Sequence, residues 1–180
     1  IKMCESYNRQ YKRDYRSVMP TNLYGPGDNY HPEDSHVIAG LLMRFHKAKI
    51  ENLDNVTVWG SGRPKREFLY IDDMARACCF IFNLNKDLYS KELNYNNSHI
   101  NIGSGKEISI LDLSNIIKKI VGFKGNIIFD QSKPDGTPRK LLDISRLDSL
   151  GWQSKIDLFE GLNKTYAWLQ DSIKKGNFRY

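Results

Sequence analysis

Apolar residues recur along the chain with two different periods, and each period predicts one kind of element. In residues 35–50 they lie on one face of a helix, with Ser35 as the expected N-cap: Val37, Ile38, Leu41, Leu42 and Phe45. The same period predicts further helices over 72–85, 108–123 and 156–175, a short one within 139–152, and one already under way at Ile1. Runs rich in β-branched and aromatic residues predict strands at 18–23, 56–60, 68–71, 100–103 and 126–131. Strands that alternate with helices in this way predict an α/β fold.

Composition and charge narrow the classes of protein to which the chain can belong. Of its 180 residues, 40% are hydrophobic and 27% are charged, as in an ordinary globular domain. The longest apolar stretches, such as 77–83, are too short to cross a bilayer, so we expect no membrane partner. A net charge of +6 favours anionic partners, but the cations lie in short, scattered runs. We therefore expect a phosphorylated small molecule as the ligand and no nucleic acid.

The three cysteines argue against a disulfide framework. Cys78 and Cys79 are adjacent, and Cys4 is left over, which is a poor basis for paired bridges. We therefore expect a reducing, cytoplasmic setting. No spacing of cysteine and histidine predicts a metal site. The helix under way at Ile1, with no Met before it, predicts that the chain is a piece of a longer protein.

Two polar features near the start of the chain are candidates for ligand binding. Thr21 and Asn22 end a predicted strand and lead into the turn "PTNLYGPGDN" at 20–29, and ligands of open α/β sheets lie at such strand ends. A polar turn without a ligand is the alternative interpretation. His36 stands at a predicted helix start, where the helix dipole favours a neutral imidazole that can serve in proton transfer. The alternative for His36 is a capping or surface histidine.

Cations gather around an aromatic residue in "VWGSGRPKREFLYIDD" at 58–73. Trp59 and Arg66 lie in this stretch, and the helix before it contains Arg44. Guanidinium groups bind phosphate oxygens in pairs and an indole ring stacks on a base or sugar, so the set suits a nucleoside diphosphate. Asp135, in the turn "KPDGTPRK", can accept hydrogen bonds from ribose hydroxyls or from a guanine edge. A solvated surface loop is the alternative interpretation.

The order of the sequence blocks carries more information than any block alone. Five of them follow one another along the chain: "PTNLYGP", "HVI", "VWGSG…REFLYIDDMARA", "INIGSG" and "KPDGTPRKLLD". In this order the chain resembles the extended short-chain dehydrogenase/reductase family, and within it the enzymes that epimerise and reduce a GDP-bound 4-keto sugar. The resemblance implies the C-terminal part of an NAD(P)-binding Rossmann fold with a small α/β substrate-binding domain. Residues 1–30 would end the Rossmann domain, 31–180 would mainly form the substrate-binding domain, and 96–105 would return to the Rossmann sheet.

The same resemblance implies a role for each candidate residue. NADP(H) is the expected cofactor, with His36 as the catalytic acid of epimerisation. The expected cofactor-binding residues are Pro20, Thr21, Asn22, Leu23 and His36. The residues expected to hold the GDP-sugar are Arg44, Trp59, Arg66 and Asp135. The implied reaction is the NADPH-dependent epimerisation and reduction of GDP-4-keto-6-deoxy-D-mannose to GDP-L-fucose by a homodimer.

The resemblance also implies that part of the family's machinery lies upstream of Ile1. The glycine-rich dinucleotide loop, a catalytic serine and cysteine, and a Tyr-x-x-x-Lys pair are not found in this sequence. We therefore expect the chain alone to be inactive and to need a missing N-terminal half of the same enzyme. Two alternatives stay open: another extended-family epimerase or dehydratase that acts on UDP-, dTDP- or GDP-sugars, and a sugar-nucleotide-binding module without catalysis.

Overall fold

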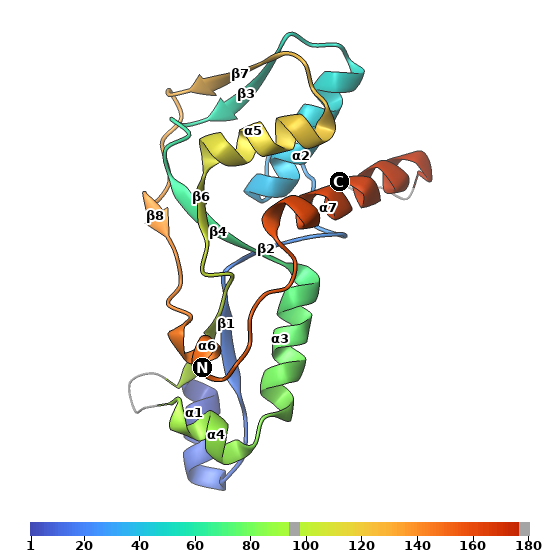
Figure 1. Ribbon diagram of the computed structural model, residues 1–180. Coiled ribbons are helices and arrows are strands. Elements are labelled where there is room, and N and C mark those ends of the chain that lie inside the picture. The colour runs from blue at the N-terminus through green and yellow to red at the C-terminus, as the bar shows by residue number, and fades with distance from the viewer. Residues whose placement is uncertain (94–97, 177–180) are drawn as a thin grey trace. The chain divides into compact units, whose positions relative to one another are not determined.

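The computed structural model describes residues 1–93 and 98–176, and the chain falls into two compact units (Figure 1). Unit 1 comprises Ile1–Leu23, Glu67–Lys106 and Leu141–Lys155. Unit 2 comprises Tyr24–Arg66, Glu107–Lys140 and Ile156–Tyr180. Both units contain helices and parallel strands, so the predicted α/β class is confirmed. None of the helices in the described ranges combines the length and the apolar character that crossing a membrane needs.

Two parallel strands form the centre of unit 1. β1 (Ser17–Pro20) pairs with β5 (His99–Ile102) along its whole length. Ile100 and Ile102 are both fully buried, because alternate residues of a strand point to the same face and this face is covered. Parallel neighbours need a long crossover connection, and here the chain between β1 and β5 supplies one.

The first strand predicted from the sequence is divided in the structure. The sequence predicts one strand over 18–23, whereas β1 ends at Pro20 and β2 (Asn22–Tyr24) begins after Thr21. The Thr21 N–H donates to the carbonyl of Ile102 at 2.9 Å, which extends the pairing with β5 by one bond. The predicted single strand is therefore wrong, and the break falls among the residues predicted to bind the cofactor.

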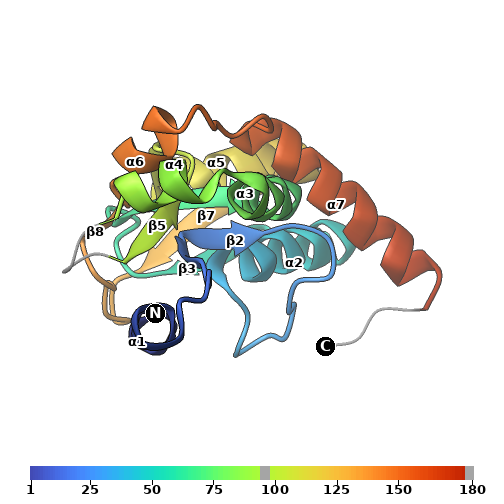
Figure 2. The same cartoon turned by 90° about the horizontal axis from the view of Figure 1, so that it is seen from below.

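Helices cover one face of this strand pair. α3 (Ile71–Asn83), α4 (Lys86–Lys91) and α6 (Ser145–Ser149) share one apolar core with β5. The buried members of that core are Leu69, Ala77, Ile81, Tyr89, Ile100, Ile102, Leu147 and Trp152. Figure 2 shows α1 (Lys2–Tyr11) on the opposite side of β1, and none of the described residues of α1 is buried. Unit 1 is therefore packed on one side of its strands and open on the side of α1.

A second parallel pair belongs to unit 2. β3 (Asn55–Trp59) pairs with β7 (Asn126–Asp130), and the two lie side by side in Figure 1. Val56 and Val58 of β3 are buried, whereas the residues between and beside them are exposed. The register sets Trp59 beside Asp130 at the carboxyl end of the pair. The pairing of β3 with β7 thus fixes the backbone position of the exposed Trp59 at the end of β3.

Three helices pack together in unit 2. α2 (Val37–Ile50), α5 (Ile110–Val121) and α7 (Leu158–Lys174) have amphipathic sequences, and α2 packs against both β3 and α5. The side chain of Ser109 caps the start of α5, and Gly122 ends it in the left-handed region at φ 74°. The buried apolar residues of these helices include Ile38, Leu41, Leu42, Phe45, Leu113, Ile117, Val121, Leu162 and Leu169.

The remaining strands are the six-residue β4 (Lys65–Tyr70) and the shorter β6 (Glu107–Ser109) and β8 (Arg139–Lys140). β4 begins in unit 2 and ends in unit 1. β8 pairs in parallel with the first two residues of β4, and β6 leads directly into α5. The sequence did not predict β6, β8 or the six-residue helix α4, because so few residues carry no detectable period.

The residue boundaries of the two units differ from those of the two domains that the resemblance implies. Residues 67–93 and 141–155, predicted to belong mainly with the substrate-binding domain, lie in unit 1, and 24–30 lie in unit 2. Residues 96 and 97 of the segment predicted to return to the Rossmann sheet lie outside the described residues. The assignment of cofactor binding and substrate binding to separate parts of the chain stays a prediction.

Candidate functional site

Four of the five residues predicted to bind the cofactor lie at the end of β1 in unit 1, whereas the fifth, His36, lies in unit 2. Pro20 is the last residue of β1, Thr21 follows in the break, and Asn22 and Leu23 begin β2. Thr21 is 7% exposed. The Asn22 side chain donates from Nδ2 to the backbone carbonyl of Glu67 at 2.7 Å, which fixes the orientation of its amide. The structure therefore brings these four residues together where β1 ends and β2 begins.

Glu67 holds this strand end from inside, and the sequence analysis did not single it out. Its side chain is completely buried. One carboxylate oxygen accepts from the Gly105 N–H at 2.7 Å and the other from the Leu142 N–H at 3.1 Å. A Cβ on Gly103 would collide with this carboxylate, so the close approach requires glycine there. In the sequence, Glu67 lies between the charged pair Lys65–Arg66 and the apolar "FLY". This position gives little indication that Glu67 is buried, because Glu67 could equally be the last residue of an exposed charged run.

Trp59 lies between two cations in unit 2. The Arg44 guanidinium is 5.6 Å from the centre of the indole ring, and the Lys133 ammonium is 5.9 Å from it. Arg44 donates to the carbonyls of Gly40 and Thr57, and burial lowers the pKa of its guanidinium. The sequence predicted Arg44 and Trp59 but not Lys133. Trp59 is 56% exposed, so the indole ring faces solvent.

Arg66 and Asp135 bind the same pair of loops together. Arg66 donates from Nη1 to the carbonyl of Thr137 at 2.6 Å. Asp135 accepts from the Ser61 N–H at 2.8 Å and from the Ser61 hydroxyl at 2.6 Å, and these two bonds lower the pKa of the Asp135 carboxyl. Gly60, at φ +82°, allows the approach, since a Cβ there would collide with Asp135. Asp135 therefore fixes the turn that follows Trp59, in addition to any contact with a ligand.

His36 occupies the start of α2, also in unit 2. The helix begins at Val37, so the N-cap is His36, and the prediction of Ser35 in that role is wrong. A cap must directly precede the first helical residue, and Ser35 lies one position too early. His36 forms no capping bond with its side chain, and its imidazole is 79% exposed. The imidazole Nδ1 lies 3.4 Å from Oδ1 of Asp28, a residue that the sequence analysis did not single out.

The structure brings together one part of the predicted site within each unit. Pro20, Thr21, Asn22 and Leu23 share unit 1. Unit 2 contains His36 and the four residues predicted to hold the nucleotide, which are Arg44, Trp59, Arg66 and Asp135. Among the residues that the structure describes, no group of three or more His, Cys, Asp or Glu side chains could hold a metal ion.

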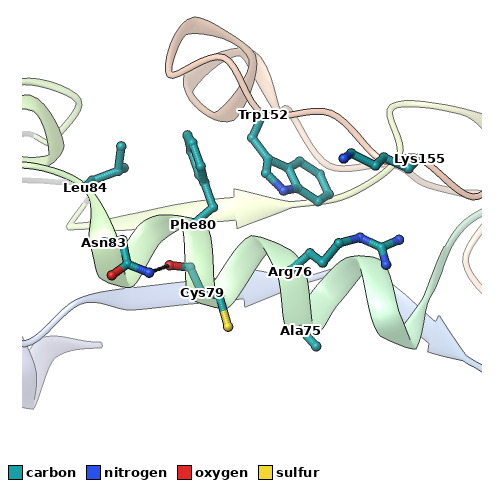
Figure 3. A pocket seen from close by; sticks show the side chains of 8 residues that line it. All are labelled: Ala75, Arg76, Cys79, Phe80, Asn83, Leu84, Trp152 and Lys155. Atoms are coloured by element: carbon teal, nitrogen blue, oxygen red, sulfur yellow. Dashed lines mark hydrogen bonds between the residues drawn. The ribbon is translucent and has the colours of Figure 1, made fainter.

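A groove of about 620 Å³ runs along α3 in unit 1 (Figure 3). Phe80, Leu84 and Trp152 line it, and Arg76 and Lys155 lie at one end (Figure 3). Its remaining lining residues are Ala75, Cys79 and Asn83. None of the predicted site residues lines this groove, so it is separate from the site that the sequence predicts.

Comparison with known proteins extends these observations to sequence relatives. A model of the "NAD dependent epimerase/dehydratase family" matches residues 1–103. The chain is 56% identical over 172 residues, 96% of its length, to the GDP-L-fucose synthase of Escherichia coli (strain K12). It is 51% identical over 173 residues to GDP-L-fucose synthase 1 of Arabidopsis thaliana. The matches cover 54% and 51% of those proteins, so the chain spans about half the length of these relatives.

A solved structure supports the same relationship. The crystal structure of a GDP-L-fucose synthetase from Naegleria fowleri bound to NADP superposes on this chain with a TM-score of 0.82. The two are 29% identical, and the match covers 96% of this chain and 53% of the other. The similarity therefore extends through both units of the chain.

Proposed function

The chain belongs to the NAD dependent epimerase/dehydratase family, and from this premise we propose that it forms part of an NADPH-dependent GDP-L-fucose synthase. In that role it would take part in converting GDP-4-keto-6-deoxy-D-mannose to GDP-L-fucose. Its identity to proteins of that name, 56% and 51%, supports the proposal. Because the chain spans about half of those proteins, the proposal concerns this chain joined to the half that it does not match.

The cluster of Arg44, Trp59, Arg66 and Asp135 in unit 2 is the observation that carries the proposal. Trp59 of β3 supplies an aromatic plate, Arg44 of α2 and Arg66 of β4 supply guanidinium donors, and Asp135 supplies a carboxylate. These are the groups that a nucleoside diphosphate requires. We assign Arg44 and Arg66 to the diphosphate and Trp59 to the base or sugar. We assign Asp135 to hydrogen-bond donors of the ribose or of the guanine edge.

NADP(H) is the cofactor we propose, and the strand end of unit 1 fits its nicotinamide end. Asn22 is held through Nδ2, which leaves its amide oxygen as an acceptor at a fixed position, and the buried Thr21 adds a hydroxyl beside it. The cofactor supplies the hydride that reduces the ketone. Pro20, Thr21, Asn22 and Leu23 orient it, and Glu67 keeps that segment in place from the core.

His36 is the proton donor that we propose for epimerisation. A proton beside a carbonyl is acidic because the enolate left behind is delocalised, so inversion needs a base on one face of the sugar and an acid on the other. The imidazole at the start of α2 is exposed and makes no capping bond, which supports a role in contact with a ligand. The base is expected in the part of the enzyme that this chain does not match.

We also propose a homodimer in the cytoplasm. The helix α1 exposes Met3, Tyr7 and Tyr11 and none of its described residues is buried, which supports its use as an interface between two copies. Cys4, Cys78 and Cys79 are free, as a reducing compartment would keep them.

The proposal is tested by supplying GDP-4-keto-6-deoxy-D-mannose and NADPH to the complete protein and, in parallel, to residues 1–180. We expect the complete protein to oxidise NADPH and form GDP-L-fucose, identified by NMR, and residues 1–180 alone to form none. Product formation by the isolated chain would contradict the assignment of the hydride machinery to the unmatched half. Tight binding of GDP without turnover by the complete protein would instead favour a binding module, and turnover of a UDP- or dTDP-sugar would favour another enzyme of the family.

A further inference from the structure

A carboxylate of low exposure lies against the exposed imidazole at the start of α2. Oδ1 of Asp28 is 3.4 Å from Nδ1 of His36, although the two residues are eight positions apart in the chain. The Asp28 side chain is 15% exposed and the His36 side chain 79%. In the described part of the chain, Asp28 is the acid within ion-pair distance of His36.

Hydrogen bonds within the loop between Asp28 and His36 bring these two residues close together. The Asn29 N–H donates to Oδ1 of Asp28 at 2.8 Å, and the Asn29 side chain donates to the carbonyl of Asp34 at 3.2 Å. Oδ1 of Asn29 accepts from the His31 N–H at 3.0 Å, and Nδ1 of His31 accepts from the Asp34 N–H at 3.3 Å. The loop therefore folds back on itself, and this returns the chain from Asp28 to His36.

The second oxygen of the Asp28 carboxylate faces the interior. Oδ2 of Asp28 is buried and makes no hydrogen bond with any residue that the structure describes. Burial and the nearby charge of Asp28 together raise the pKa of the Tyr30 hydroxyl, so the carboxylate also acts on a fully buried phenol. A carboxylate that water reaches poorly gains much from a cationic partner, because its charge is weakly screened. A protonated His36 is such a partner.

We propose that Asp28 is a positioning residue that holds His36 for proton transfer, a role that rests on the proposed function of His36 as the epimerisation acid. Asp28 accepts a hydrogen bond from Nδ1–H, so Nε2 is the ring atom directed at the substrate. When the enolate collapses, the Nε2–H bond breaks, its proton forms the new C–H bond with the electron pair of the enolate, and the ketone is restored. The neutral ring keeps Nδ1–H, and Nε2 is reprotonated from water.

The distance between Oδ1 of Asp28 and Nδ1 of His36 is consistent with a hydrogen bond that shortens when substrate binds. Charge-assisted bonds of this type measure about 2.7–2.9 Å, which is shorter than the 3.4 Å between Asp28 and His36. Catalytic hydrogen bonds are often long in the absence of substrate and shorten in the complex. Because His36 is largely exposed, its ring has room to move toward the carboxylate.

The tautomer of His36 in the complete protein, read from the ¹⁵N shifts of its ring by NMR without substrate, tests the pair directly. We expect Nδ1–H in the unmodified protein and mainly Nε2–H in Asp28→Ala, with the His36 signal assigned by its loss in His36→Asn. Asp34→Ala is the matched control, because Asp34 lies in the same loop and its carboxylate is 3.6 Å from His31, not His36. If Asp28→Ala does not fold, the nearly isosteric Asp28→Asn replaces it, since its amide donates to Nδ1 and again favours Nε2–H.

Deuterium uptake from solvent into the sugar of GDP-4-keto-6-deoxy-D-mannose provides the functional readout. We expect Asp28→Ala to slow the uptake about tenfold to a hundredfold with the KM for the sugar nucleotide changed less than about twofold, because the acid and not the binding site is disturbed. Asp34→Ala should keep the unmodified rate. Unchanged uptake and an unchanged Nδ1–H ring in Asp28→Ala would overturn the proposal. If the unmodified protein shows no uptake, the proposed function fails, and the tautomer measurement still decides whether Asp28 positions His36.

Discussion

The two groups of predicted site residues are held in opposite ways. In unit 1, Thr21 and Asn22 are fixed from inside, by the carbonyl of Glu67, a residue whose carboxylate is completely buried. In unit 2, Trp59 is 56% exposed, and Arg66 and Asp135 are held by bonds between two surface loops. One group is part of the core, and the other is assembled at the surface.

Because of this difference, we expect substitutions in the two groups to affect different properties: the free energy of unfolding in one group and the affinity for the nucleotide in the other. The buried carboxylate of Glu67 accepts from two partly buried backbone N–H groups, so removing it leaves both donors without their partner. Side chains in solvent-exposed loops can be removed at little cost to folding, because water replaces their lost partners. We therefore expect substitutions in unit 1 to act on folding and substitutions in the unit 2 loops to act on nucleotide binding.

The largest expected effect is on folding, at Glu67. Glu67→Ala should lower the free energy of unfolding by about 3 kcal/mol, because the N–H groups of Gly105 and Leu142 lose their acceptor. Glu107→Ala is the control: Glu107 pairs with Lys65 and Arg139 nearer the surface, and its removal should cost far less. Urea denaturation of the complete protein measures both, and equal losses in the two variants would remove the contrast between core and surface.

The next effect is on affinity, at Arg66. Arg66→Ala should weaken GDP binding by about 2 kcal/mol, or about 30-fold, as expected for the loss of a charge-assisted contact to phosphate. Its free energy of unfolding should change little. Lys47→Ala removes one positive charge from an exposed side chain of α2 and controls for net charge. Isothermal calorimetry with GDP and UDP provides the measurement; an unchanged GDP affinity, or equal affinity for the two nucleotides, would contradict the assignment.

A smaller effect is expected at Ser61, which has no assigned contact with the ligand. Ser61→Ala removes the hydroxyl that donates to Asp135 at 2.6 Å, so the turn that follows Trp59 loses one of its two hydrogen bonds to that carboxylate. We expect GDP binding to weaken about threefold to fivefold. In a double-mutant cycle, Ser61→Ala should add little to the effect of Asp135→Ala, because both disturb one contact. Additive losses would show that the two residues act independently.

The smallest effect is a pH dependence in the core of unit 2. His46 is buried and bonds to the Tyr166 hydroxyl, and burial, with the charge of Lys49, lowers the pKa of its imidazole. The unfolded chain therefore binds a proton at a higher pH than the folded one, near the ordinary histidine value of about 6.5. Stability should be full above that value and fall as the pH drops through it, by at most about 1.4 kcal/mol per pH unit. Thermal unfolding between about pH 8 and pH 5.5 measures this, and His46→Phe should flatten that part of the profile.

Much of the framework was determined by the sequence itself. The helical period alone located α2, α5 and α7. These features depend on neighbours within one or two turns, so local spacing is sufficient to show them. The order of the blocks along the chain identified the family, because several separate segments agree at once.

Only the tertiary structure decided which polar residues work together. Glu67 follows Lys65 and Arg66 in the chain, yet it is buried while those two residues are not, because β4 enters there a core that no local pattern reveals. Lys133 reaches Trp59, Asp135 reaches Ser61, and Asp28 reaches His36 across gaps in sequence that folding alone closes. The spacing of apolar residues predicts whether a segment forms a helix or a strand and which of its faces is buried. Hydrogen bonds between segments that are distant in the sequence depend on the positions of those segments in the folded protein.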